Sequence, residues 1–89
     1  MNREWLTKKV TVEEAESAHL VRNEQLGPEP VPFGFMYQDW KQLLAAMQPG
    51  DELWEFSSPE DAWKHLAGRA GFAVVRNGTP VASLVTMMN

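Results

Sequence analysis

An Asn-Gly pair between two apolar runs is the feature that most constrains how this chain can fold. Residues 72–76 read FAVVR, residues 79–87 read TPVASLVTM, and Asn77 and Gly78 separate them. A two-residue type I′ turn needs positive φ at both central residues, which Asn and Gly adopt most readily. The sequence therefore predicts a C-terminal β-hairpin, whose facing pairs outward from the turn are Arg76 with Thr79, Val75 with Pro80 and Val74 with Val81.

Apolar residues at helical spacing predict a helix over residues 36–47. They recur at intervals of three and four on one face, and Pro49 and Gly50 then end the pattern. A second helix is predicted after Thr11, because Thr11 and Glu14 have the spacing of a capping box. We expect this helix to run to about residue 25.

A third helix is predicted over residues 59–67. Ser58 suits its N-cap, and Pro59 suits its first position. Its expected buried face consists of Ala62, Trp63, Leu66 and Ala67.

Residues 27–34 carry three prolines at alternate positions, which forbids a helix and favours an extended connector. We expect this Pro-rich connector to be an ordered loop, with a hinge or a partner-binding strip as alternatives.

Two more segments have strand character, residues 5–10 as an edge strand and residues 52–57. The fourteen residues 58–71 are long enough for a right-handed crossover, so residues 52–57 are predicted to run parallel to the 72–76 strand. We place the 72–76 strand in the middle of the sheet.

These elements predict one α+β domain spanning residues 1–89, because a chain of this length can bury one modest core. We expect two layers: a small mixed sheet of three to four strands with the C-terminal hairpin, and about three helices. The helices of Trp40 and Trp63 are predicted to cover one face of the sheet.

Charge and composition argue against several classes of partner. Eight Lys and Arg against twelve Asp and Glu give a net charge of −4, and only Arg3, Lys8 and Lys9 approach a basic cluster, so we do not expect nucleic acid to bind. No apolar stretch approaches the roughly 20 residues of a membrane span, and residues 1–10 lack the apolar run of an export signal. We therefore expect a cytoplasmic protein without membrane contact, which the absence of cysteine suits.

The sequence offers one arrangement for a metal site. Glu16 and His19 are three residues apart, and Asp61 and His65 are four apart, so two helices could supply four ligands. Ordinary partners on helix surfaces explain both pairs without a metal. We predict no metal and no cofactor.

A hydrolase site would need Ser57 or Ser58 beside His65 and Asp61. Ser58 is better explained as a helix cap, and no nucleophile-elbow sequence surrounds either serine. The glycines form no phosphate-binding loop. We predict no catalytic residues and identify no small-molecule substrate.

Two resemblances concern the C-terminal half. The runs GDELWEFSSPEDAW, GRAGFAVVRNG and VTMMN, within residues 50–89, resemble a group of small bacterial proteins of unknown function. The run RNGTPVASLV, residues 76–85, is similar to the hairpin of Phd/YefM-type bacterial antitoxins, which implies an antitoxin-like regulator as one alternative. A winged-helix DNA-binding regulator is a related alternative, although the helix before the hairpin offers only Lys64 and His65 as basic groups.

The residues without an evident structural role suggest an interaction surface. Trp5 stands among polar residues, where an aromatic side chain could anchor a partner. No charged residue follows Arg76, so the last strand, with Leu84, Met87 and Met88, presents an apolar edge. Monomeric proteins usually blunt such an edge with Lys, Pro or a bulge. We expect residues 5–10 to cover that edge, with the Pro-rich connector or a partner chain as alternatives.

We therefore predict a non-catalytic protein-interaction or regulatory domain of a bacterium, with a protein partner or self-association. The alternatives are a DNA-binding regulator and a small metal-dependent enzyme.

Overall fold

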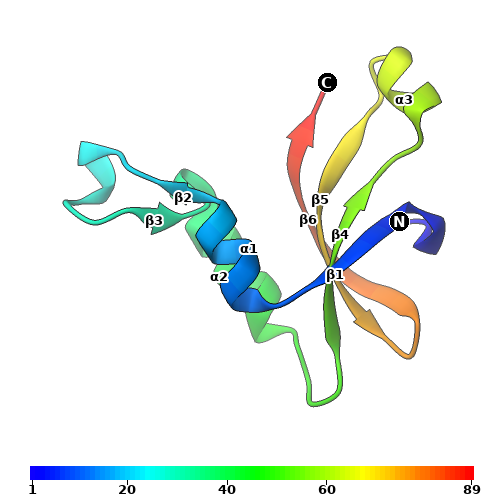
Figure 1. Ribbon diagram of the computed structural model, residues 1–89, viewed down its shortest axis with the longest axis horizontal. Helices are drawn as coiled ribbons and strands as arrows, with labels where there is room; N and C mark the ends of the chain where they lie inside the picture. Colours follow the sequence, from blue (N-terminus) through cyan, green and yellow to red (C-terminus); the bar gives the residue numbers. More distant parts are fainter.

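A four-stranded antiparallel sheet, with two helices against one face, forms the body of the computed structural model, which describes residues 1–89 (Figure 1). In spatial order the strands are β1 (Leu6–Val10), β4 (Glu52–Ser57), β5 (Arg69–Arg76) and β6 (Thr79–Met88). The two helices on the face are α1 (Val12–Ala18) and α2 (Tyr37–Ala45). The α+β class and the C-terminal hairpin predicted from the sequence are confirmed.

The remaining elements lie at the periphery. A two-stranded ribbon pairs β2 (Leu20–Val21) with β3 (Val31–Pro32), and α3 (Glu60–Lys64) lies at the end of the sheet, away from α1 and α2 (Figure 1). Single 3₁₀ turns occur at Arg3–Trp5, Glu24–Leu26 and Gly34–Met36.

The hairpin forms as its turn chemistry predicts. Asn77 and Gly78 have φ of 52° and 78°, which is the positive-φ pair that a type I′ turn requires. Arg76 pairs with Thr79 and Val75 pairs with Pro80, which confirms the two predicted pairs next to the turn. The third pair was predicted wrongly. Val74 lies opposite Ala82, because a β-bulge adds Val81 directly after Pro80, where the proline has no N–H to continue the ladder.

β5 lies between β4 and β6, as predicted, but the direction of β4 corrects the sequence prediction. β4 pairs with β5 antiparallel, so the sheet is not mixed. The connection contains a helix of only five residues, too short to cross the face of the sheet. Instead the chain reverses at the end of β4, where Ser57 pairs with Ala70 and the Ser58 amide donates to the Arg69 carbonyl at 2.8 Å.

The third helix also differs from its prediction. Pro59 is its N-cap and its side chain makes no capping hydrogen bond, while the Ser58 hydroxyl accepts from the Arg69 amide at 2.9 Å. The helix ends at Lys64, and Leu66 is 75% exposed with φ of 58°. Because the chain turns back into β5 here, the helix stops before Leu66 despite the helical spacing of the apolar residues.

Trp63 consequently packs at the end of the sheet and not over its face. Its indole N–H donates to the Ser57 hydroxyl and to the Ser58 carbonyl, both at 3.2 Å. Its ring lies against Gly68, where a Cβ atom would overlap it. Trp63 and Gly68 therefore close the β4–β5 connection.

The first helix has the predicted capping box but is shorter than expected. The Glu14 amide donates to the Thr11 hydroxyl at 3.0 Å, and the Thr11 amide donates to the Glu14 carboxylate at 2.9 Å. The helix ends at Ala18, well before residue 25, and the chain continues into β2. The amide of Phe33, in the Pro-rich connector, donates to the His19 carbonyl at 2.8 Å and fixes this change of direction.

The core lies between the α1–α2 layer and the part of the sheet that contains Val10, Leu53, Phe72 and Val74. Trp40 on α2 is fully buried, as its helical spacing predicts, and its ring contacts Phe33 and Phe72 at centroid distances of 4.3 and 5.5 Å. Its indole N–H donates to the Glu16 carboxylate on α1 at 2.8 Å. One side chain thus joins both helices, the connector and β5.

An ion pair holds the loop after α2 against the hairpin. The Arg76 guanidinium donates from Nε to Asp51 Oδ1 at 2.9 Å and from Nη2 to Oδ2 at 2.7 Å. The Asp51 side chain is only 2% exposed, and its Oδ2 also accepts from the Gln48 amide at 2.9 Å. The pKa of Asp51 lies below its ordinary value of 3.8, chiefly because of the hydrogen bonds from Arg76 and next because of the hydrogen bond from the Gln48 amide.

This lowered pKa predicts acid sensitivity. Because the pKa of Asp51 is lower in the folded than in the unfolded chain, the pair stabilises fully above the unfolded value of 3.8 and is lost as the pH falls through the folded value. We expect Asp51→Asn to be less stable at neutral pH and to lose less stability on acidification below about pH 4. Thermal unfolding followed by circular dichroism measures both. Equal acid-induced losses in the parent and the variant would contradict this role of Asp51.

A second prediction concerns Gly71 in β5. A Cβ atom there would overlap the carbonyl oxygen of Leu84 on β6 and lie 3.0 Å from the Thr86 amide nitrogen. Neither backbone group can move without breaking the β5–β6 ladder, so we expect Gly71→Ala to cost about 1–3 kcal/mol of unfolding free energy. Ser83→Ala, at an exposed position of β6, should change it by less than about 0.5 kcal/mol. Urea denaturation compares them, and equal stability of the two variants would be the opposing result.

Candidate functional site

The two edges of the main sheet differ in charge. β1 forms one edge and exposes Lys8 and Lys9, whereas β6 forms the other and carries no charged residue. Lysine on an edge strand discourages pairing with another chain, and an uncharged edge lacks that protection. The edge of β6 is therefore the candidate interaction site.

The expectation that residues 5–10 cover the β6 edge is wrong. These residues form β1, which pairs with β4 on the opposite side of the sheet. An acidic side chain of β4 favours this position, because Lys9 forms an ion pair with Glu52 at 3.0 Å. The Pro-rich connector does not pair with β6 either, since its strand β3 pairs with β2.

Backbone features limit where the β6 edge can pair. Pro80 lacks an N–H, and register shifts in the β5–β6 ladder leave Val81 and Thr86 as bulged residues. Residues 82–85 form an uninterrupted ladder between the two bulges. This central stretch is therefore the part of the β6 edge that no proline or bulge interrupts.

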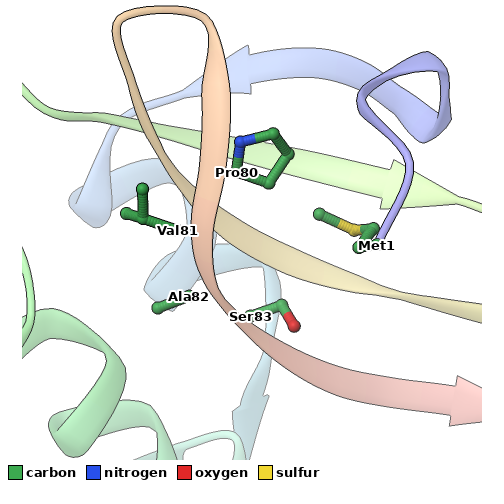
Figure 2. A pocket seen from close by; sticks show the side chains of 5 residues that line it. All are labelled: Met1, Pro80, Val81, Ala82 and Ser83. Carbon is green, nitrogen blue, oxygen red and sulfur yellow. The ribbon is translucent and has the colours of Figure 1, made fainter.

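The N-terminal residue reaches only the start of β6. A hollow of about 160 Å³ lies between Met1 and residues 80–83, and Figure 2 shows Met1 beside Pro80 and Ser83 with Val81 on the opposite side of the strand. Val81 is 46% exposed. Met1 leaves the edge of β6 without a neighbouring strand.

The structure separates the four predicted surface residues. Met87 and Met88 lie at the end of β6 and are 62% and 61% exposed. Leu84 is half-buried and packs against the core, so its role is structural. Trp5 is half-buried in the turn before β1, and β4 and β5 separate β1 from β6. Only Met87 and Met88 belong to the candidate site.

Leu66 is an exposed apolar residue next to the candidate site, although the sequence predicted that its side chain is buried. The Asn89 side chain accepts from the Gly68 amide and donates to the Trp63 carbonyl, both at 2.8 Å, which holds the end of β6 against the loop that carries Leu66. The helical spacing of Leu66 predicted burial, and no local signal in the sequence marks the early end of α3 at Lys64. Leu66, Met87 and Met88 are thus exposed apolar residues at one end of the sheet.

The residues considered for metal binding have other partners. The Glu16 carboxylate accepts from Trp40, and the His19 ring stacks on Phe33 at a centroid distance of 4.9 Å. His65 Nδ1 lies 2.8 Å from the Asp61 carbonyl oxygen. The structure contains no group of three or more His, Cys, Asp or Glu side chains that could hold a metal ion.

The serines considered for hydrolysis also have structural partners. The Ser57 hydroxyl accepts from Trp63, and the Ser58 hydroxyl accepts from Arg69. Both serines therefore stabilise the β4–β5 connection.

None of the helices combines the length and apolar composition that crossing a membrane requires. Comparisons of the chain with known protein families, with curated proteins and with solved structures find no match.

Proposed function

We propose that this chain is a non-catalytic protein-interaction domain that associates with a second copy of itself through the edge of β6. The observation that carries the proposal is the ten-residue edge strand, which has no charged side chain and no neighbouring strand on its outer side. A free edge offers backbone donors and acceptors to an added strand, the mode of binding known as β-augmentation.

The absence of charge favours a second copy as the partner. Two identical strands that pair about a two-fold axis run antiparallel, so each side chain meets its own kind or a near neighbour. A charged strand would then oppose like charges, whereas residues 82–85 read ASLV and bring none together. The flexible side chains of Met87 and Met88 can adapt to the partner surface at the end of the strand.

The hairpin offers little to the alternative of a DNA-binding regulator. Residues 77–89 contain no basic side chain, and Arg76 before the turn is paired with Asp51. A protein that contacts phosphates needs free Lys or Arg at the contact.

We extend the proposal to a bacterial, cytoplasmic setting, in which a cysteine-free domain is stable without disulfides.

The proposal predicts weak, concentration-dependent dimerisation that a charge at the centre of β6 weakens. Ser83→Lys would place two like charges near the two-fold axis, at the centre of the uninterrupted stretch, and should raise the dimer dissociation constant by at least about tenfold. Thr79→Lys is the matched control, because it adds the same charge on β6 next to the turn, before Pro80. Sedimentation velocity over a range of protein concentrations measures the association.

Two results would refute pairing at this edge. One is a parent chain that remains monomeric at every concentration. The other is a dimer that tolerates Ser83→Lys as well as it tolerates Thr79→Lys.

A further inference from the structure

The helix-side face of the sheet is only partly covered. α1 and α2 pack over the part of this face that contains Leu53 and Val74. The end of β4, the start of β5 and the end of β6 lead away from the two helices (Figure 1). A hollow of about 250 Å³ lies over this open part, between His19 and the strands that carry Glu55, Phe72 and Met87. A neighbouring hollow of about 110 Å³ shares His19, Glu55 and Phe72 with it.

Glu55 is unusual among the acidic residues of the chain. Four acidic residues are partly buried, and three of them have a partner within the chain: Glu16 with Trp40, Asp51 with Arg76, and Glu52 with Lys9 and Trp54. The carboxylate of the fourth, Glu55, forms no hydrogen bond and no ion pair, and it lines both hollows. The structure contains no buried side-chain oxygen without a hydrogen-bond partner, so the Glu55 oxygens are accessible from the hollows and free to accept hydrogen bonds from a bound donor.

The hydroxyl groups that line the larger hollow donate elsewhere. Thr7 donates to the Glu55 carbonyl at 3.2 Å, Ser57 to the Ser58 carbonyl at 3.3 Å and Thr86 to the Ala70 carbonyl at 3.5 Å. Each hydroxyl has one proton, so the oxygens of Thr7 and Thr86 can only accept a further hydrogen bond. The polar lining on the strands is therefore a set of acceptors with one negative charge.

We infer that this hollow binds a Lys or Arg side chain of a partner polypeptide. Both groups are cations that donate hydrogen bonds and accept none, which complements a lining of acceptors around a carboxylate. Their methylene stems suit the apolar surface of Phe72 and Met87. The net charge of −4 attracts a basic partner over a longer range.

The nearest cation of the chain itself leaves Glu55 free. Lys8 lies opposite Glu55 in the β1–β4 ladder and lines the smaller hollow, but its side chain is exposed and forms no ion pair with Glu55. Glu14 also lines the smaller hollow and is engaged in the capping box with Thr11. A ligand cation therefore meets an unoccupied carboxylate.

Fluorescence anisotropy with a labelled pentapeptide, Gly-Leu-Lys-Leu-Gly, tests this inference on the full chain at low ionic strength. Norleucine in place of Lys keeps the length of the stem and removes the charge, and should weaken binding by at least about tenfold, the size expected for a lost charged hydrogen bond. A third peptide with Arg in the central position should retain binding.

The protein variants locate the binding. Glu55→Gln should weaken the Lys peptide by at least about tenfold and leave the norleucine peptide unchanged. Glu29→Gln removes the same charge from an exposed position in the Pro-rich connector and should leave binding unchanged. Because Glu55 has no partner within the chain, Glu55→Gln should melt at the same temperature as the parent, which separates lost binding from lost folding.

The inference is overturned if Glu55→Gln binds the Lys peptide as the parent does, or if the Lys and norleucine peptides bind equally. It is also overturned if Lys8→Gln raises the affinity by more than about tenfold, since Lys8 would then already occupy Glu55 in solution. Ser83→Lys should bind the peptide normally. Failure of dimerisation and failure of peptide binding are thus separate results.

Discussion

The buried ring of Trp40 is the contact on which the rest of the arrangement depends. It packs between Phe33 of the connector and Phe72 of β5, and its indole N–H binds Glu16 on α1. A fully buried indole needs an acceptor, so this hydrogen bond ties the short helix α1 to α2. The helices are thereby held over the part of the sheet that contains Leu53 and Val74, which leaves the end of β4, the start of β5 and the end of β6 open beside His19.

The distribution of charge along the strands accounts for the difference between the two edges. β4 carries Glu52, and Lys9 of β1 forms an ion pair with it. β6 carries no charge and takes the opposite edge, where Pro80 and two bulges limit its pairing to the central residues. The contacts that stabilise the fold thus concentrate charge at one edge and leave an uncharged strand at the other.

The open face and the open edge meet at Met87 but have different chemistry. At the edge, backbone groups of β6 are available to another strand, and affinity would come from main-chain hydrogen bonds. On the face, Glu55 and the threonine oxygens are available to a donor, and affinity would come from charge. Most other polar side chains near these sites are already used, as Ser57 and Ser58 are in the β4–β5 connection.

Local chemistry made much of the fold predictable from the sequence: the type I′ turn at Asn77 and Gly78, the capping box at Thr11 and the apolar face of α2 each depend on residues within a few positions of one another. Met87 and Met88 are candidates because they lie in a long run without charge, and the structure shows both side chains exposed. The direction of β4, the early end of α3 with the exposure of Leu66, and the edge that β1 occupies were decided by tertiary structure. So was the lack of a partner for Glu55. These features depend on which distant strands and side chains meet, and such contacts compete with local propensity only once the chain has folded.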